Sequence, residues 1–350
     1  MKTSCKLILI ILLLSVCPHR ADAQQFLWNV DFTTFFDNRE FKAPYQSPQT
    51  FFGTRLSPEV GLRVAERHEL LGGASWIHEM GSKSNGKVDA TIYYRYSDSH
   101  FKAALGAFPR RLLVEEYPAA MVYDSLLYYR PNINGALIQY IAPTGYAEAY
   151  IDWRSRQSYA DREIFTLATN GRFSGPIVGG GWNLTLTHFS CTKNAPEDMS
   201  VFDNIVINPY LAVDLSHRTP LDSLSLRAGA LISLDRNRGD GIWHHPAGFL
   251  GELTAEWWRL GIKEVLYAGG RHLTFFDTYG STLHMGDPFY RARFYSRTDL
   301  YSYFLRGKFV ELKASVNFHT AGGRLQTQQQ LVLKFQLNRE ATSRLLPRRK

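Results

Sequence analysis

Cysteine is scarce in this 350-residue chain, which contains three. Cys5 and Cys17 lie in an apolar segment near the N-terminus, so Cys191 is the one cysteine in the remainder of the sequence. A single cysteine cannot form an internal disulfide bond. A mature chain of this size is therefore expected to close its structure by backbone pairing and side-chain packing.

Long hydrophobic runs are also missing. The apolar stretch 7–17 is too short to cross a membrane as a helix, and no later segment approaches the roughly 18 apolar residues that a membrane helix needs. Residues 1–23 have the pattern of a secretory signal peptide, and the mature chain is expected to begin near Gln24. The flanking residues that carry this pattern are Lys2, Lys6, Ala21 and Ala23. A lipoprotein signal ending at Cys17 is a less favoured alternative, because Val16 is bulky for the preceding position.

The basic excess of the chain is concentrated at its ends. The formal net charge is +8, of which residues 1–23 contribute +2 and the basic tail 339–350 contributes +4, leaving about +2 for the body. A nearly neutral body gives no reason to expect nucleic acid as a partner. Walker, GxSxG and HExxH motifs are absent from the sequence, so no cofactor is expected.

Alternation with a period of two dominates the chain and predicts β-strands. In 309–320, for example, apolar side chains fall on one face and polar side chains on the other. About sixteen strands are expected, near 26–38, 59–67, 69–79, 88–97, 100–108, 133–142, 145–155, 162–173, 177–190, 202–215, 222–235, 248–259, 261–269, 288–299, 308–320 and 326–338.

The connections between these strands alternate between long and short. The stretches 39–50 and 108–131 are long, for example, whereas 67–68 and 143–144 are tight turns. Long loops at one rim and short turns at the other are typical of an outer-membrane β-barrel with extracellular loops and periplasmic turns. A soluble sandwich or propeller also alternates, but it has no reason to keep this order of loop lengths. The predicted fold class is therefore an all-β transmembrane antiparallel β-barrel.

With this pattern of strands and loops, residues 24–338 resemble the sixteen-stranded general porins of Gram-negative outer membranes. The resemblance implies that the third long loop, 108–131, folds into the lumen and narrows it. It also implies a location in the outer membrane, contact with its lipid, passive diffusion of small hydrophilic solutes and assembly as a homotrimer. The tail 339–350 departs from the family, whose members commonly end on an aromatic residue.

A constriction of this kind would place acidic side chains of the loop opposite arginines of the wall, which orients passing solutes and sets ion preference. The candidates on the loop are Glu115, Glu116 and Asp124, and those on the wall are Arg63, Arg95, Arg154, Arg227, Arg291 and Arg293. A structural role, in which luminal charges pair with one another, explains the same residues. No metal site is expected, because the loop residues His244, His245, His272, Asp277, His284 and Asp287 lack a tight ligand spacing.

The alternative function is a lipid hydrolase. In the strand 177–190, His188 and Ser190 continue the lipid-facing side toward the long loops, an arrangement similar to that of outer-membrane phospholipase barrels. Ser190 is followed by Cys191 and Thr192, whereas that family has Asn-Gly. A plugged structural or adhesive barrel is the third possibility. Polar residues at a membrane rim are common, so the sequence favours a channel that is not an enzyme.

Overall fold

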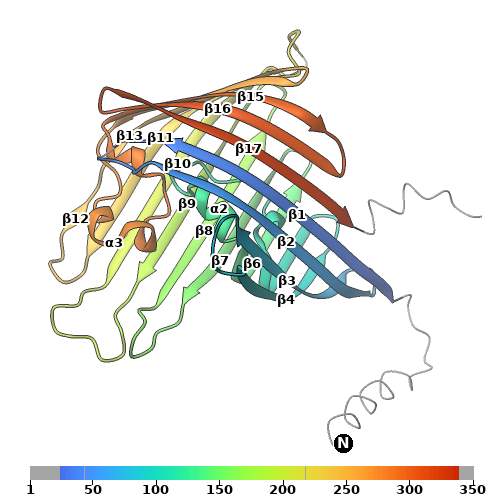
Figure 1. Cartoon of the computed structure of the whole chain (residues 1–350), viewed down its shortest axis with the longest axis horizontal. Helices are drawn as coiled ribbons and strands as arrows, with labels where there is room; N and C mark the ends of the chain where they lie inside the picture. Colours follow the sequence, from blue (N-terminus) through green and yellow to red (C-terminus); the bar gives the residue numbers. More distant parts are fainter. Residues whose placement is uncertain (1–23, 43, 217, 339–350) are drawn as a thin grey trace, which may run out of the picture.

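The computed structural model describes residues 24–42, 44–216 and 218–338. The predicted signal peptide 1–23 and the basic tail 339–350 lie outside the described residues. The strands of the described residues form one closed antiparallel sheet (Figure 1). Closure is made by β1, which pairs with β2 on one side and with β17 on the other, so the predicted barrel is confirmed.

Within the part of the chain that the structure describes, the sheet has seventeen strands, of which β12 has 2 residues and the others are long. They are β1 (Gln25–Glu40), β2 (Gln49–Val64), β3 (His68–Glu79), β4 (Lys87–Ser97), β5 (Phe101–Pro109), β6 (Asn132–Ala142), β7 (Gly145–Ser155), β8 (Ile164–Ser174), β9 (Val178–Phe189), β10 (Phe202–Asp214), β11 (Ser223–Asn237), β12 (Trp243–His244), β13 (Ala247–Trp257), β14 (Leu260–Gly269), β15 (Phe294–Arg306), β16 (Val310–Ala321) and β17 (Arg324–Asn338).

Side chains alternate between a buried inner face and an exposed outer face, as the period of two predicts. In β7, Glu148, Tyr150 and Asp152 are buried, whereas Trp153 is exposed. Exposed apolar residues on other strands continue this outer surface; they include Leu62, Ile92, Leu105, Ile138, Leu211, Leu253 and Leu300. A continuous apolar exterior is what a barrel wall in contact with lipid requires. Among the described residues, no helix has the length and apolarity to cross a membrane.

Two predicted strands differ from the structure. The strand expected at 59–67 begins earlier, at Gln49. It can include Pro58 because the pairing with β3 is interrupted between Leu56 and Glu59. The strand expected at 288–299 is the 3-10 helix η2 (Pro288–Arg291) followed by β15. Pro288 has no backbone N–H for a strand ladder, and the Asp287 side chain accepts the Phe289 N–H at the start of η2.

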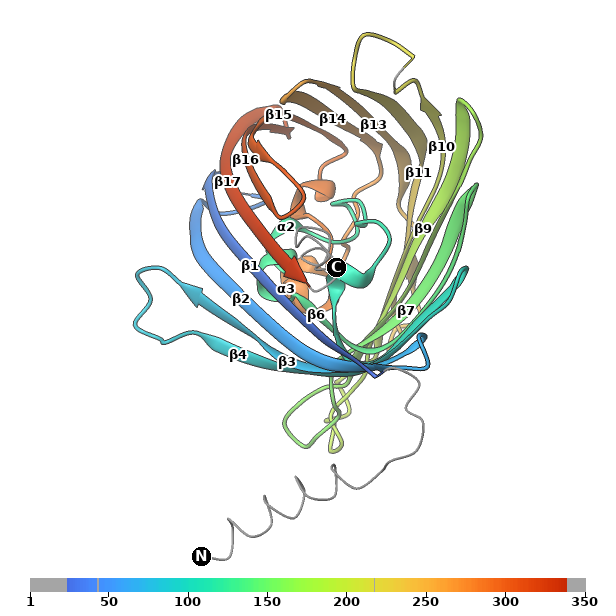
Figure 2. The same cartoon turned by 90° about the vertical axis from the view of Figure 1, so that its right-hand side faces the viewer.

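Two long connections fold into the barrel from the same rim (Figure 2). The first, 110–131, contains η1 (Arg110–Leu112) and α2 (Asp124–Tyr129); the second, 270–293, contains α3 (Phe276–Leu283) and η2. They are bonded to each other, since the Tyr123 N–H donates to Met285 O at 2.8 Å and the Asp287 N–H donates to Ala119 O at 2.8 Å. The third long loop therefore enters the lumen as predicted, and it meets a second insertion there.

The buried core lies between these insertions and the inner wall. It includes Phe41, Tyr93, Phe108, Met121, Ile133, Phe289, Tyr290 and Tyr295. Asp124 of α2 also forms an ion pair with Arg297 of β15, at 3.2 Å. The two connections are thus packed against the wall, and their apolar side chains fill space that a wide pore would leave to water.

Candidate functional site

One pair from the expected constriction is brought together. Glu115 of the first insertion lies between two wall strands, with Oε2 at 3.3 Å from Arg227 of β11 and Oε1 at 2.5 Å from Arg172 of β8. Asp124 contacts Arg297 instead, and Glu116 is exposed. The sequence did not single out Arg172 or Arg297, because inward arginines occur on many strands and the register across the lumen is not encoded locally.

The other predicted arginines lie elsewhere. Arg63 and Arg95 both contact Glu69, close to the short turn between β2 and β3. Arg154 donates to the carbonyl of Ser281 in the second insertion, at 3.1 Å. Their constriction role remains a prediction.

Arg291 and Arg293 were expected on a strand that faces the lumen, which is wrong. Arg291 ends η2 and pairs with Asp277 at 2.6 Å, and Arg293 is an exposed residue of the connection before β15. The apolar and aromatic residues around them suggested alternation, but Pro288 starts a helical turn there.

The second candidate site lies on the outer face, at the rim with the long connections. His188 near the end of β9 is directly opposite Asp203 at the start of β10, so both side chains lie on one face of the sheet. His188 Nδ1 is 2.8 Å from Asp203 Oδ1. Because a carboxylate only accepts, Nδ1 carries the proton and Nε2 of a neutral His188 is left as a base.

Asp203 is held in place by a second partner. Arg238, in the connection after β11, donates from Nε to Asp203 Oδ2 at 2.7 Å and from Nη2 to Asp203 Oδ1 at 3.1 Å. A bidentate arginine keeps the carboxylate ionised and fixes its orientation. Sequence reasoning missed Asp203, because it belongs to the next strand and 15 residues separate it from His188.

Ser190 follows β9 directly, two positions after His188. Its backbone N–H donates to Glu163 O at 2.9 Å, which continues the β8–β9 pairing beyond the strand end. The residue between them, Phe189, points inward and packs against Tyr279 of α3. Ser190 is partly exposed, and its hydroxyl makes no hydrogen bond within the described part of the chain. A serine hydroxyl without a hydrogen bond and an oriented histidine two positions away are the two residue types that a nucleophile and its base require.

Two aromatic rings lie beside this outer site. Phe165 of β8 lies 5.0 Å from the His188 ring and stacks on Trp153 of β7 at 5.3 Å, measured between ring centroids. Aromatic side chains at the end of a barrel strand mark the level of the lipid head groups. The Asp203–His188–Ser190 group therefore lies beside aromatic side chains at the long-loop end of the barrel.

A different serine–histidine pair lies inside the barrel. Ser233 Oγ of β11 is 2.6 Å from His272 Nδ1 in the second insertion. Asp235 lies two residues after Ser233, but its carboxylate accepts from Asn204 and Thr274. Burial lowers the pKa of His272 to about 4, so this histidine is neutral at physiological pH. Ser233 is 1% exposed, which leaves no access for an acyl chain.

No group of three or more potential metal ligands comes together among the described residues. Two of the loop histidines are used in other contacts: His272 bonds Ser233, and His284 Nε2 accepts from Phe275 N.

Comparison with solved structures places this fold among outer-membrane porins. OprB of Pseudomonas putida superposes with a TM-score of 0.52 at 9% identity, over 90% of this chain and 94% of that one. OccK5 (OpdH) of Pseudomonas aeruginosa gives 0.52 at 8% identity, over 90% and 98%. OmpT of Vibrio cholerae lacking loop L8 gives 0.51 at 10%, over 90% and 100%. The predicted fold is confirmed.

A search of curated proteins finds no match. The family model for lipid A 3'-O-deacylase-type proteins matches residues 19–340. That family is one of enzymes, so the expectation that the protein is not an enzyme is wrong. That expectation rested on the alternation of long and short loops and on the residues of the lumen. These features describe the barrel, and they carry no information about chemistry on its outer face. Because the match covers nearly the whole sequence, the chain belongs to the lipid A 3'-O-deacylase-type family.

Proposed function

We propose that the protein is an outer-membrane hydrolase that cleaves an ester-linked acyl chain of lipid A, with Ser190 as the nucleophile. The observation that carries this proposal is the 2.8 Å contact between His188 Nδ1 and Asp203 Oδ1 on the outer face, two positions from Ser190. It supplies the oriented base that the sequence alone did not provide. The family match adds the substrate class.

The chemistry is an acyl transfer in two steps. Ser190 Oγ attacks the ester carbonyl while His188 Nε2 takes the hydroxyl proton. The tetrahedral intermediate collapses, the sugar oxygen leaves with the proton from His188, and the acyl group stays on Ser190. Water then attacks the acyl-serine with His188 as the base, which releases the fatty acid and restores the hydroxyl. Asp203 stabilises the imidazolium that forms in both steps.

The location of the pair favours the outer site over Ser233 and His272. An acyl chain of the outer leaflet lies against the apolar exterior, where it reaches the end of β9 without leaving the membrane. To reach Ser233 it would have to enter a lumen that two insertions occupy. Substrate access therefore distinguishes two serines that both have a histidine nearby.

The test is mass spectrometry of lipid A from cells that carry the full-length protein. The wild type and Ser233→Ala are expected to remove an acyl chain, whereas Ser190→Ala is expected to lose roughly 10⁴-fold or more in rate. All three proteins must be present in the outer membrane at equal amounts. Deacylation that persists in Ser190→Ala and disappears in Ser233→Ala would move the site to the interior.

Passage of small solutes is a second candidate function. It is favoured by Glu115, which lies between Arg172 and Arg227 and retains 23% side-chain exposure, so that opposed charges meet in a hydrated part of the lumen. Single-channel conductance in a planar bilayer tests it, and deletion of 119–126 should increase the current. A silent bilayer with both proteins would remove this candidate and leave the hydrolase intact. Assembly as a homotrimer remains a prediction of the porin architecture.

A further inference from the structure

A cavity of about 740 Å³ opens among the connections of the long-loop rim. The segments that form its wall are the β1–β2 connection, β12 with the residues after it, the start of the second insertion, and η2. Its lining residues are Pro44, Tyr45, Trp243, His244, His245, Pro246, Arg271, His272, Leu273, Thr274, Asp277 and Arg291. The candidate site on β9 and β10 uses none of these residues.

The charge of the lining is predominantly basic. Arg271 is exposed and makes no ion pair within the described residues, so its guanidinium is available to a ligand. Arg291 is paired with Asp277, the one carboxylate of the lining, at 2.6 Å. An arginine that lacks a protein partner in a cavity wall suits a phosphate or carboxylate group, because the planar guanidinium donates to two oxygens at once.

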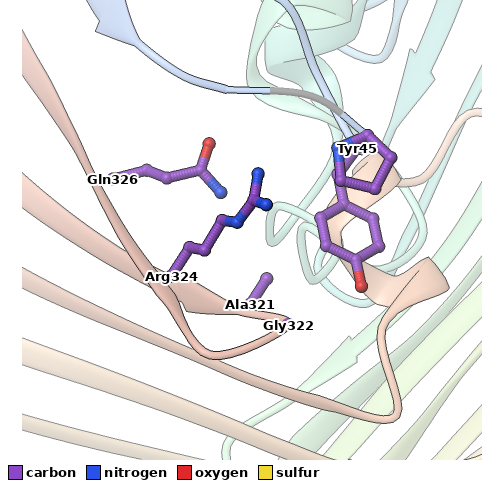
Figure 3. A pocket seen from close by; sticks show the side chains of 6 residues that line it. Tyr45, Ala321, Gly322, Arg324 and Gln326 are labelled. Carbon is purple, nitrogen blue, oxygen red and sulfur yellow. The ribbon is translucent and has the colours of Figure 1, made fainter.

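Aromatic faces complete the wall. Trp243 is 44% exposed, and the Arg236 guanidinium lies 5.1 Å from its ring centroid. Tyr45 borders both this cavity and a smaller one of about 160 Å³, toward which Arg324 extends from the start of β17 (Figure 3). Rings that expose an apolar face beside polar groups are suited to packing against a sugar.

A buried polar atom in the lining has no protein partner. His272 is 4% exposed, its Nδ1 is bonded to Ser233 Oγ, and its Nε2 is buried without a hydrogen bond. Buried polar atoms are nearly always paired, so an unpaired one in a cavity wall is a position that a ligand hydroxyl or phosphate oxygen satisfies. The lining of the cavity therefore offers a ligand both polar atoms and aromatic rings.

The cavity lies next to the proposed catalytic group along the sheet. Register connects His188 of β9 to Asp203 of β10, Asp203 to Arg236 of β11, and Arg236 to Trp243 of β12. Three strand steps correspond to about 14 Å at the usual strand spacing. A sugar head group in the cavity therefore leaves its acyl esters within reach of the end of β9.

We propose that this cavity binds a phosphorylated sugar, and that in the membrane this is the head group of the lipid whose ester reaches Ser190. The inference rests on the proposed function for its lipid source. The phosphate contacts Arg271, the sugar ring packs against Trp243, and His272 Nε2 bonds one of the ligand oxygens. The cavity determines which lipid is presented to the outer site.

The test measures binding separately from hydrolysis, with full-length Ser190→Ala as the background. Three probes are compared: vesicles of phosphatidylcholine with lipid A, vesicles of phosphatidylcholine alone, and soluble glucose 1-phosphate. Arg271→Gln is expected to weaken binding of the phosphorylated probe about tenfold or more, since a charge-assisted contact is lost. The matched control is Lys83→Gln, which removes one exposed positive charge from the β3–β4 connection of the same rim.

The probes distinguish the two sources of the ligand. Arg271-dependent binding to lipid A vesicles but not to glucose 1-phosphate identifies the lipid head group, and competition by glucose 1-phosphate identifies the sugar phosphate itself as sufficient. Equal affinity in Arg271→Gln and Lys83→Gln for every probe would overturn the cavity assignment. Failure of the wild type to deacylate lipid A, with Arg271-dependent binding retained, would instead count against the proposed reaction.

Discussion

Substitution of Gly286 by alanine should separate the two insertions that occupy the lumen. Gly286 lies between Met285 and Asp287, whose backbone groups make the two hydrogen bonds to the first insertion. A Cβ at this position would lie 2.1 Å from the carbonyl oxygen of Ala120 and 2.9 Å from its carbon. Both atoms belong to the backbone, so the segment that contains Gly286 and the segment that contains Ala120 must move apart.

The size of the effect follows from the contacts that are lost. A separation large enough to relieve the clash stretches both 2.8 Å hydrogen bonds beyond bonding distance. At about 1 kcal/mol net for each bond, the docked arrangement loses about 2 kcal/mol, or roughly thirtyfold in its equilibrium with an undocked one. The barrel wall does not contain this contact, so the strands should fold as before.

The assay is the frequency of open events in single-channel recordings of the full-length protein. Gly72→Ala is the matched control, because a Cβ there meets its nearest atom, Thr91 O, at an ordinary 3.8 Å. Gly286→Ala should open far more often than the wild type, and Gly72→Ala should not. Indistinguishable recordings from all three proteins would refute the reasoning that backbone contact between the insertions restricts the lumen.

Three further predictions concern single side chains. Asp203→Asn should lower kcat for deacylation by roughly 10²- to 10⁴-fold with little change in KM, since it acts through His188; an unchanged kcat would exclude that positioning role. Burial raises the pKa of the Asp287 carboxyl to about 7, although Arg297 opposes this and Asp124 reinforces it. Docking of the insertions should therefore be fully stable below the ordinary aspartate pKa and weaken as pH rises toward 7. Single-channel recordings should then show more open events at pH 8 than at pH 5. The Asp287→Asn variant should lose that dependence on pH. Glu115→Gln should shift any ionic current toward anion selectivity, because the remaining luminal arginines lose their counter-charge; reversal potentials in a salt gradient measure this.

The barrel was predictable from the sequence because its determinants are local. A period of two reports which residues share a face, and loop length reports which rim a connection belongs to. The first insertion was predictable for the same reason, since 108–131 interrupts the alternation. At 288–299 the same signal gave the wrong structure. Aromatic and basic residues alternate across η2, but Pro288 starts a helical turn there instead of a strand.

The sites were only partly predictable, because their partners are distant in sequence. His188 and Ser190 are two residues apart and were singled out as an alternative, whereas Asp203 and Arg238 depend on the pairing of β9 with β10 and on a loop beyond β11. The contact of Glu115 with Arg227 likewise depends on where an insertion comes to rest inside the barrel. Alternation gives the face of a residue but not its neighbour across the lumen.

The most direct test of the central claim is to label the full-length protein with a fluorophosphonate, which reacts covalently with activated serines, and to map the modified peptide. The account predicts modification of Ser190, loss of labelling in Ser190→Ala, and strongly reduced labelling in His188→Ala. Modification of Ser233, or labelling of Ser190 that does not depend on His188, would contradict it.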